Sequence, residues 1–435
     1  MRIAVVGTGH VGLVAGTGFA DNGHQVVCVD KDAARIEMLR AGKLPIYEPG
    51  LEELVMRNIE EERLSFSTDT KKAVESSLIV FLCVGTPEGP GGTPDVSQVL
   101  HAAGEIGDAL NEYKVIVSKS TCPVGTVERI ADTIRARTPH RFDVVANPEF
   151  MKEGAAIDDF MRPDRVVVGC ADVRVIEIMK ELYAPFLRSG KPFLAMDVRS
   201  AELSKYAVSA MLGARISLIN EIANIAEAYG ADIDHVRQAL MADRRIGPES
   251  LYPGLGYGGS CLPKDVIALS ELARDAGLPG GVIDGTAAAN TAQLQRFGDR
   301  ILTHYGDSLA GKRIAVWGAS FKSKTDDIRN APAIGLIDRF LEAGAEVRAY
   351  DPEAGANLRA RYGDRITVAS RVYAAAEQAD GLIIATEWRE FHNPDFERLG
   401  TLMREKAIFD GRNLYNPKIV RRHGFFYVGV GREGK

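Results

Sequence analysis

The segment Arg2-Ile-Ala-Val-Val-Gly7-Thr-Gly9-His-Val-Gly12 opens the chain and indicates its fold class. Its first half is a short apolar strand, its second half is a glycine-rich turn, and an apolar helix over 13–22 follows. A second strand, Gln25–Val29, then ends at Asp30. A strand, a glycine-rich turn, a helix, a second strand and a terminal acid, in this order, are typical of a dinucleotide-binding βαβ unit.

Each glycine of the turn has its own expected task. Gly7 makes the tight turn, Gly9 admits the pyrophosphate, and Gly12 lets the helix and the strand pack closely. The helix N-terminus offers backbone N–H donors and a positive dipole to the phosphates. His10 and Val11 lie between the glycines, so they are expected to line the cofactor, and His10 is not expected to be catalytic.

The residues at the end of the second strand predict which cofactor binds. Asp30 is placed to accept hydrogen bonds from the adenosine ribose. Its carboxylate repels the additional phosphate of NADP, so the predicted cofactor is NAD. Lys31 and Arg35 follow closely and weaken this preference, and both join the cofactor-binding candidates.

The first βαβ unit is extended and later repeated. Four further strands are expected at 78–84, 115–118, 144–146 and 166–168, and the last of them is expected to complete the sheet. Arg313-Ile-Ala-Val-Trp-Gly318 then resembles Arg2–Gly7, and Gly344–Asp351 resembles Gly23–Asp30. A second doubly wound unit therefore begins near Lys312. Its turn lacks the second and third glycines, which favours another nucleotide-containing ligand over a second dinucleotide.

A long helical pattern separates the two units. It opens at Ser200, which can cap it, and ends at Gly230. A helix of this length suits a link between domains and a dimer surface. The predicted fold class is α/β, with two doubly wound Rossmann-like domains joined by a long central helix and a helical dimerisation region. The predicted domains are 1–197, 198–305 and 306–435.

Composition excludes several classes of protein. At 435 residues the chain is too long for a single core, and its net charge of −6 argues against a nucleic-acid partner. No apolar run is long enough to span a membrane, and the first strand begins too early for a signal peptide. The 5 cysteines are scattered and odd in number, which is typical of the reducing cytoplasm. The 8 histidines show no metal-ligand spacing, so no metal is expected.

Polar residues follow the strands of the first unit, at the sheet edge where ligands bind in doubly wound folds. Thr86, Ser120 and Thr121 are placed there, although each hydroxyl could equally serve a turn or a cap. Glu149 and Glu153 follow the strand at 144–146 and suit acid–base work or ribose contacts. The alternative is that both are acids in the first turn of a helix.

The segment Leu255–Asp265 places Cys261 just ahead of a helix N-terminus, with Lys264 close by. Both features favour the nucleophilic thiolate, whereas most cysteines outside disulfides are small buried hydrophobes. Lys205 and Ser209 are four residues apart on the central helix and share a face. Lys205 could contribute to a site or only extend along apolar surface toward water.

Basic residues elsewhere are candidates for anionic ligands. Lys322, Lys324, Arg329 and Arg412 lie at or beyond strand ends of the second unit, where they could meet phosphates. Arg245 lies in a turn that could be a ligand clamp. For each of them, solvated surface charge is the alternative.

Seven motifs in order resemble the UDP-glucose/GDP-mannose dehydrogenase family, and the resemblance covers nearly the whole chain. The resemblance implies an NAD-binding domain, a helical dimerisation region and a C-terminal domain that holds UDP. It also implies oxidation of the sugar's 6-hydroxyl to a carboxylate with reduction of two NAD+. The motifs are Gly7-Thr-Gly-His-Val-Gly12, Gly85-Thr-Pro87, Ser120-Thr-Cys-Pro-Val-Gly125, Asn147-Pro-Glu-Phe150, Glu202-Leu-Ser-Lys205, Gly256-Tyr-Gly-Gly-Ser-Cys261 and Asp410-Gly-Arg412.

The resemblance implies roles for five residues in the chemistry. Cys261 captures the intermediate aldehyde as a thiohemiacetal and then carries a thioester. Lys205 stabilises the oxygens on which negative charge develops. Asp265 and Thr121 position the catalytic water, and Glu149 acts as acid or base.

The resemblance also implies contacts with the ligands. The predicted cofactor-binding residues are Gly7, Gly9, His10, Val11, Gly12, Asp30, Lys31, Arg35, Thr86, Thr121, Glu153, Lys264 and Arg329. The predicted substrate-binding residues are Glu149, Phe150, Met151, Glu153, Lys205, Arg245, Ser250, Tyr252, Gly258, Cys261, Phe321, Lys322 and Arg412. Arg245 matches an arginine that is offered across a dimer interface.

Three positions depart from the family pattern, and one of them, Cys122 in place of the usual valine, is expected only to pack. Ser209 stands where the family usually has Asn; it can donate one hydrogen bond to a developing oxyanion, but it reaches less far. Ser250 stands where an aromatic residue is common. The segment Gly256-Tyr257-Gly258 favours UDP-glucose as substrate and UDP-glucuronate as product. GDP-mannose or an N-acetylated UDP-hexose is the alternative substrate, and a non-catalytic nucleotide-sugar-binding protein is the alternative function. We expect a cytoplasmic homodimer or higher homo-oligomer that binds neither membranes nor nucleic acid.

Overall fold

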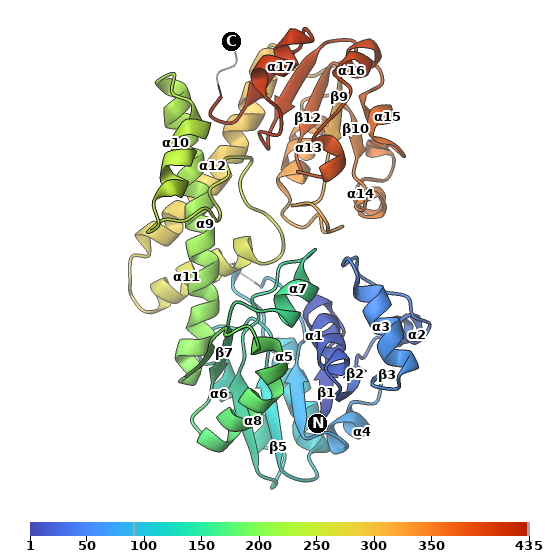
Figure 1. Ribbon diagram of the computed structural model, residues 1–435, viewed down its shortest axis with the longest axis vertical. Helices are drawn as coiled ribbons and strands as arrows, with labels where there is room; N and C mark the ends of the chain where they lie inside the picture. The colour runs from blue at the N-terminus through green and yellow to red at the C-terminus, as the bar shows by residue number, and fades with distance from the viewer. Residues whose placement is uncertain (90–91, 433–435) are drawn as a thin grey trace. The chain divides into compact units, whose positions relative to one another are not determined.

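The computed structural model describes residues 1–89 and 92–432. The chain folds into two compact units, Met1–Val208 and Ser209–Lys435, called unit 1 and unit 2 below. Figure 1 labels helices and strands of both units where there is room. Within the described residues, no helix is both long and apolar enough to cross a membrane.

Unit 1 is built on an eight-stranded sheet in the order β3-β2-β1-β4-β5-β6-β7-β8. The first six strands are parallel, and β7 joins β6 antiparallel through the single pair Ala146 and Gly169. The strands are β1 (Arg2–Val6), β2 (Gln25–Val29), β3 (Leu64–Ser67), β4 (Ile79–Leu82), β5 (Lys114–Ser118), β6 (Phe142–Ala146), β7 (Val166–Gly169) and β8 (Phe193–Met196). The helices are α1 (His10–Asp21), α2 (Ala33–Arg40), α3 (Leu51–Glu60), α4 (Thr70–Glu75), α5 (Ser97–Ala109), α6 (Thr126–Arg135), α7 (Ala156–Met161) and α8 (Val173–Tyr183).

Helices cover both faces of this sheet because successive strand residues point to opposite sides. Ile3 and Val5 of β1 belong to the core that includes residues of α1, α3, α7 and α8. Ala4 and Val6 belong to the core on the other face, which includes residues of α4, α5 and α6. The apolar run at the start of the chain therefore forms a central strand of a three-layer α/β/α unit.

The sheet of unit 1 extends further than expected. The prediction that the strand at 166–168 completes it is wrong, because β8 pairs parallel with β7. Only four residues form β8, and none of them is fully buried. Its sequence, Phe-Leu-Ala-Met, is apolar, but a run of four residues is too short for periodicity to identify it as a strand.

Unit 2 contains a six-stranded parallel sheet in the order β11-β10-β9-β12-β13-β14. Its strands are β9 (Arg313–Trp317), β10 (Glu346–Tyr350), β11 (Thr367–Val368), β12 (Gly381–Ile384), β13 (Ala407–Asp410) and β14 (Phe426–Gly429). Its helices are α10 (Ile233–Ala242), α11 (Leu262–Asp275), α12 (Gly281–His304), α13 (Pro332–Glu342), α14 (Gly355–Tyr362), α15 (Val372–Ala376), α16 (Phe396–Leu402) and α17 (Pro417–Arg422). The predicted fold class is confirmed.

Two cores hold unit 2 together. Ile314 and Val316 of β9 pack in a core with residues of α12, α13 and α14. Residues from α10 and from the second half of α9 (Val198–Ala228) join this core. Ala315 and Trp317 face the opposite core, which includes residues of α15, α16 and α17. The helical segment at 209–304 therefore shares a core with the second sheet.

The long central helix, α9, runs over Val198–Ala228, so it is 31 residues long and contains the boundary between the two units. The prediction that Ser200 caps it is wrong, because the Asp197 carboxylate accepts a hydrogen bond from the Ser200 backbone N–H at 2.9 Å. An acidic residue just before the first turn satisfies a backbone donor in the same way as a serine cap. The predicted division at 1–197, 198–305 and 306–435 stays a prediction.

Candidate functional site

The glycines of the first turn have the geometry that a dinucleotide requires. Gly7 has a φ of +101°, and a Cβ there would lie 2.6 Å from the Cys83 carbonyl oxygen. At Gly12 a Cβ would lie 1.9 Å from the Gly7 carbonyl oxygen, whereas at Gly9 it would meet nothing within 4 Å. Gly7 and Gly12 therefore maintain close packing, and Gly9 leaves open space at the N-terminus of the 12-residue helix α1, where a pyrophosphate fits.

Asp30 at the end of β2 is an ionised acceptor beside this turn. Its Oδ2 accepts hydrogen bonds from the Thr8 backbone N–H at 2.9 Å and from the Thr8 hydroxyl at 2.8 Å. Arg35 lies 3.7 Å away. Burial alone raises the pKa of Asp30, but the hydrogen bonds from Thr8 and from the Asp32 N–H outweigh it, so the pKa lies below its ordinary value. The carboxylate is therefore charged at neutral pH.

The equivalent aspartate of unit 2 is arranged differently. Asp351 follows β10 and is buried, and its Oδ2 accepts hydrogen bonds from the backbone N–H groups of Ala319 and Ser320 at 2.7 and 3.0 Å. The Ser320 hydroxyl and the indole N–H of Trp388 donate to the same oxygen. Because its own chain saturates this carboxylate, it cannot bind a ribose in the way expected of Asp30.

Hydroxyl residues at the ends of β4 and β5 hold two loops together. Thr86 donates a hydrogen bond to the Thr121 carbonyl at 2.9 Å, and Ser120 donates to the Val84 carbonyl at 2.7 Å. The expected location of these residues at the carboxyl edge of the sheet is confirmed. Two of their hydroxyls secure the loops that present Thr121.

A buried ion pair joins two of the predicted catalytic residues within unit 1. The Lys205 ammonium lies 2.8 Å from Glu149 Oε1, and the two side chains are 7% and 6% exposed. The Met151 N–H donates to the other Glu149 oxygen at 2.7 Å, and Phe150 lies beside the Lys205 ammonium. Burial raises the pKa of Glu149, but the charge and hydrogen bond of Lys205 outweigh it, so the pKa lies below its ordinary value. The sequence alternative, that Lys205 only extends along apolar surface, is wrong.

A second buried lysine was not predicted. Lys119 at the end of β5 donates hydrogen bonds to Asn147 Oδ1 at 3.1 Å and to the Tyr183 hydroxyl at 3.3 Å. Burial lowers its pKa to about 8, even though the charges of Cys83 and Glu149 oppose the shift. Lys119 therefore adds a further positive charge that acts on Glu149, and it lies in the run Ser118-Lys-Ser-Thr121, whose hydroxyls alone were predicted to meet ligands.

Glu202 was also missed as a connecting residue. The sequence placed it only in the motif Glu202-Leu-Ser-Lys205, but its carboxylate accepts hydrogen bonds from the Gly125 N–H at 2.7 Å and the Val127 N–H at 2.8 Å. It therefore caps α6 from another helix. Since Thr121 lies just before that cap and Lys205 lies one turn beyond Glu202, this contact fixes two predicted catalytic residues relative to each other within unit 1.

Within unit 2, Cys261 is the N-cap residue of the 14-residue helix α11 and is exposed, while the other four cysteines of the chain are buried. The Ser260 hydroxyl lies 3.6 Å from its sulfur. Asp265, in the first turn of α11, is 1% exposed and accepts a hydrogen bond from the Ser209 hydroxyl at 2.7 Å. The single hydroxyl proton of Ser209 therefore goes to Asp265 in this structure. Ser209 cannot donate the same proton to an oxyanion at the same time.

The glycine-rich segment before Cys261 is held against the loop that follows β9. A Cβ on Gly258 would lie 2.3 Å from the Asn330 carbonyl oxygen, and a Cβ on Gly259 would lie 2.9 Å from the Phe321 ring. The Gly259 N–H also donates to the Arg329 carbonyl at 3.0 Å. Only glycine allows this approach, so the segment brings the loop carrying Cys261 beside the predicted nucleotide-binding residues of unit 2.

The basic candidates of unit 2 fall into two groups. Arg412 is part-buried and donates hydrogen bonds to the Phe321 carbonyl at 2.9 Å and the Ala385 carbonyl at 2.8 Å. Lys322 extends over the Phe321 ring. By contrast, Arg329 and Arg245 are 66% and 88% exposed and pair with the carboxylates two residues before them, Asp327 and Asp243 respectively.

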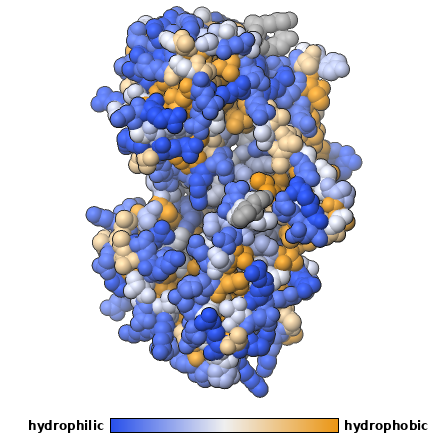
Figure 2. Space-filling view, turned by 180° about the vertical axis from the view of Figure 1, so that it is seen from behind, coloured by the Kyte–Doolittle hydropathy of each residue, from blue (hydrophilic) through white to orange (hydrophobic). Residues whose placement is uncertain are grey.

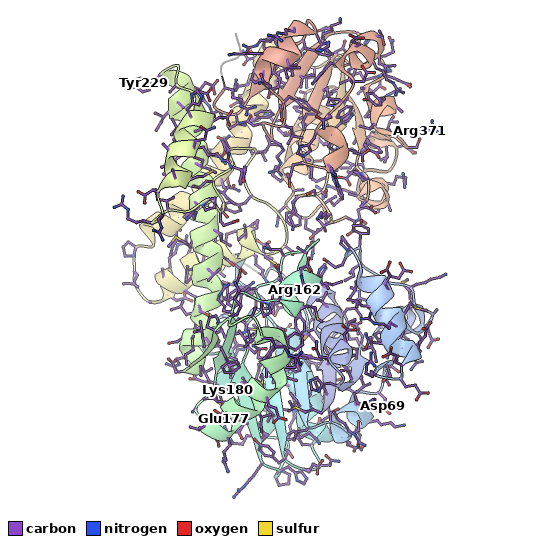
Figure 3. The ribbon with its side chains drawn as sticks, viewed as in Figure 1. Asp69, Arg162, Glu177, Lys180, Tyr229 and Arg371 are labelled. Carbon is purple, nitrogen blue, oxygen red and sulfur yellow. The ribbon has the colours of Figure 1, made fainter. Side chains whose placement is uncertain are left out.

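The remaining candidates are placed as follows. Tyr252 is 66% exposed and lies against the Arg237 guanidinium, and Ser250 has a φ of +58°. Figure 3 shows the side chains of both units as sticks. Val11, Met151, Glu153 and Lys264 are half-buried, and Lys31 is exposed. Among the described residues, no group of three or more His, Cys, Asp or Glu side chains could hold a metal ion.

Comparison with known proteins gives consistent matches along the chain. Residues 1–187 match the NAD binding domain of the UDP-glucose/GDP-mannose dehydrogenase family, residues 199–292 match its central domain and residues 315–417 its UDP binding domain. The UDP-glucose 6-dehydrogenases of Pseudomonas aeruginosa and Rhizobium meliloti are 43% and 44% identical, over 99% of this chain and 98% and 100% of theirs. A UDP-glucose dehydrogenase structure from Pyrobaculum islandicum is 36% identical with a TM-score of 0.92, covering 99% of this chain and 98% of that one.

Proposed function

Because the chain belongs to the UDP-glucose/GDP-mannose dehydrogenase family, we propose that it oxidises UDP-glucose to UDP-glucuronate and reduces two NAD+ per sugar. The prediction of NAD as the cofactor is confirmed by the NAD binding domain over residues 1–187. Full-length relatives at 43% and 44% identity that are named UDP-glucose 6-dehydrogenase support this choice of sugar. The segment Gly256-Tyr257-Gly258 supports it as well.

The observation that carries the proposal is the placement of Cys261. It is the exposed cysteine of the chain, and it caps a helix whose first turn contains the buried Asp265. A thiolate at a helix N-terminus is stabilised by the helix dipole. Oxidation of an alcohol to a carboxylate passes through an aldehyde, and a nucleophile that retains this aldehyde gives the second oxidation a good hydride donor.

The proposed chemistry has three stages. NAD+ supplies the hydride acceptor for both oxidations, one molecule for each. The 6-carbon first loses a hydride and its oxygen loses a proton, which gives an aldehyde. The Cys261 thiolate adds to that carbon, and loss of the second hydride leaves a thioester. Water then attacks the thioester carbon, the C–S bond breaks, and the products are a carboxylate and the regenerated thiol.

In this proposal the residues of unit 1 stabilise developing negative charge and accept a proton. Lys205 offers an ammonium group where negative charge develops on the sugar oxygen. Its present partner, Glu149, is a charged carboxylate in a buried setting, so it can accept a proton when the ammonium turns to the substrate. Thr121, held by the Thr86 contact, helps to position water.

The residues of unit 2 position the nucleophile and the nucleotide. Asp265 orients water for thioester hydrolysis. Ser209 holds the Asp265 carboxylate in position through the 2.7 Å hydrogen bond. Arg412, Lys322 and Phe321 meet around one loop and are the proposed contacts to UDP. The UDP binding domain over 315–417 supports this assignment.

The test is the yield of NADH per sugar consumed. We expect two NADH per UDP-glucose and little turnover of GDP-mannose or N-acetylated UDP-sugars. Cys261→Ser should greatly slow turnover while NAD+ binding is retained, and Cys170→Ser, at a buried cysteine just after β7, is the matched control. A yield of one NADH per sugar, or full activity of Cys261→Ser, contradicts the proposal.

We also propose that the protein is a homodimer that packs through α9. Within unit 2, Met211, Leu218 and Ile225 are 65%, 55% and 58% exposed at seven-residue intervals, so they form one apolar helix face. Tyr229, labelled in Figure 3 just after α9, is 86% exposed. The face seen in Figure 2 is mainly hydrophilic, with apolar residues in separate patches. An exposed apolar stripe of this kind is typical of helix pairing.

The oligomeric state tests the interface. Light scattering coupled to gel filtration should give the mass of a dimer for the wild-type chain and that of a monomer for Leu218→Asp. Leu278→Asp, at an apolar residue that is 60% exposed outside α9, should remain dimeric. A wild-type monomer, or a dimer that survives Leu218→Asp, rules out this interface.

A further inference from the structure

His10, the first residue of α1, contacts a carboxylate that the sequence analysis did not consider. Its Nε2 lies 2.8 Å from Oε2 of Glu48, and the Glu48 side chain is 1% exposed. Glu48 lies in the connection between α2 and α3. A buried charge is costly unless it is paired and hydrogen-bonded, so this contact requires further compensation.

The compensation comes from the segment that leads into α7 and from the first residue of that helix. Glu48 accepts a hydrogen bond from the Gly154 N–H at 2.7 Å and another from the Ala156 N–H at 2.9 Å. Gly154 directly follows Glu153, which belongs with Glu149 to the loop after β6. One buried carboxylate therefore links the dinucleotide turn, through His10, to the loop that carries two predicted site carboxylates.

Three negative charges act on the His10 ring. They belong to Glu48, Glu153 and Glu149, from the α2–α3 connection and from the loop before α7. Burial lowers the pKa of His10, but the close contact with Glu48 and the charges of Glu153, Glu48 and Glu149 outweigh it, so the pKa lies above its ordinary value. His10 therefore keeps its proton to a higher pH than an unperturbed imidazole does.

We propose that Glu48 is a positioning residue which holds a protonated His10 beside the cofactor phosphates, so that NAD affinity falls as His10 loses its proton. The proposal deepens the proposed function and rests on its NAD cofactor, but it does not depend on the identity of the sugar. Gly9 leaves open space directly before His10, and this is where the pyrophosphate fits. His10 is therefore the titrating side chain at the first turn of α1.

The direction of the effect follows from the charges. While His10 is protonated, its positive charge offsets Glu48, and the N-terminus of α1 attracts the anionic pyrophosphate. When the pH rises through the pKa of His10, the imidazole becomes neutral and Glu48 remains charged, so the local potential becomes negative. We expect the Kd for NAD+ to rise about three- to tenfold across this transition, as a single partly screened charge implies.

Linkage requires the reciprocal effect. If proton binding to His10 favours NAD+, then NAD+ must raise the pKa of His10. This can be measured directly by following the His10 ring proton by NMR as a function of pH, with and without NAD+ and without any sugar. If the contact between His10 and Glu48 only maintains structure, NAD+ should leave the titration midpoint of His10 unchanged.

Three variants test the proposal through NAD+ binding by calorimetry between pH 5.5 and 9. His10→Gln keeps a hydrogen-bond donor but cannot titrate, so its Kd should not change across the transition. Glu48→Gln removes the negative partner, so the midpoint should move to lower pH. His101→Gln is the matched control, because His101 also faces a glutamate, Glu105 at 3.5 Å, but is exposed on α5.

The wild-type protein and His10→Gln alone decide the question if Glu48→Gln does not fold. A wild-type Kd that does not change with pH overturns the proposal, and so does an unchanged pH dependence in His10→Gln. An NMR midpoint of His10 that NAD+ does not raise overturns it equally. Because all measurements use NAD+ without sugar, failure of the UDP-glucose assay would leave this result standing, and the reverse also holds.

Discussion

Replacing Lys205 by Met tests whether its ion pair with Glu149 has the energetic weight that the structure indicates. Methionine has a similar length and no charge, so the substitution removes the ammonium group and leaves Glu149 in place. The two side chains are 7% and 6% exposed, and their charged atoms lie 2.8 Å apart. Removing one partner of such a pair leaves an uncompensated buried charge, which costs about 3–5 kcal/mol at neutral pH.

The pH dependence distinguishes this cause from a general packing defect. In the wild-type protein the pKa of Glu149 is lowered, because Lys205, the Met151 N–H and Lys119 together outweigh burial. A lowered pKa contributes stability that is present above the unfolded value of about 4.3 and is lost as the pH falls through the folded pKa. Without Lys205 the largest opposing charge is gone, so the pKa rises.

A raised pKa reverses the sign of the contribution that Glu149 makes to folding stability at neutral pH. In Lys205→Met the buried Glu149 opposes folding above the unfolded pKa, and protonation relieves this cost as the pH falls. The difference in unfolding free energy between wild type and variant should therefore be largest near pH 7 and shrink toward pH 4. The double variant Lys205→Met/Glu149→Gln should recover most of the loss at pH 7, since it buries no charge.

Guanidinium unfolding followed by tryptophan fluorescence and by circular dichroism separates a loss of stability in unit 1, which contains Lys205 and Glu149, from one in unit 2. Trp317 and Trp388 are the two tryptophans of the chain, and both lie in unit 2, whereas far-UV circular dichroism reports on both units. We expect the dichroism transition of Lys205→Met to lose about 3–5 kcal/mol at pH 7. A loss below about 1 kcal/mol, or an equal loss at pH 4 and pH 7, would refute the assignment of a buried ion pair.

Three further predictions concern unit 1. Gly12→Ala places a Cβ 1.9 Å from a backbone oxygen and should cost about 1–3 kcal/mol in thermal unfolding, whereas Gly9→Ala should unfold like the wild type but bind NAD+ more weakly in calorimetry. Asp30→Asn should raise the affinity for NADP+ relative to NAD+, because it removes a charge that repels the additional phosphate. Glu202→Gln replaces a charged cap of α6 with a neutral one and should cost about 1–2 kcal/mol, with a fall in kcat that Ser204→Ala does not share.

The sequence predicted the parts of the molecule that depend on local pattern. The roles of Gly7 and Gly12 follow from a turn between a strand and a helix, and the backbone geometry confirms both. The repeat that begins near Lys312 predicted the second sheet in the correct place. These features depend on neighbouring residues, so a single segment contains the information that specifies them.

The contacts that the sequence did not predict join residues far apart in the chain. Glu48 binds the backbone of Gly154 and Ala156, and Glu202 binds the backbone ahead of α6. A carboxylate that accepts from backbone N–H groups of another segment leaves no trace in those segments, because every residue except proline offers the same donor. Periodicity and spacing therefore cannot reveal such contacts, although the position of Glu48 between Pro45 and Pro49 is unusual for a glutamate.

The two units show how one fold acquires two binding tasks. Asp30 and Asp351 end equivalent strands, and each accepts hydrogen bonds from the turn that follows the first strand of its own unit. Asp30 takes its turn contacts through one residue, Thr8, and its side chain remains 14% exposed at an open glycine turn. Asp351 is buried, and the Trp388 indole is a further donor that closes it from solvent. The second turn is thus filled by its own side chains, so any nucleotide bound by unit 2 must be held by residues such as Arg412 and Lys322 instead of by a dinucleotide turn.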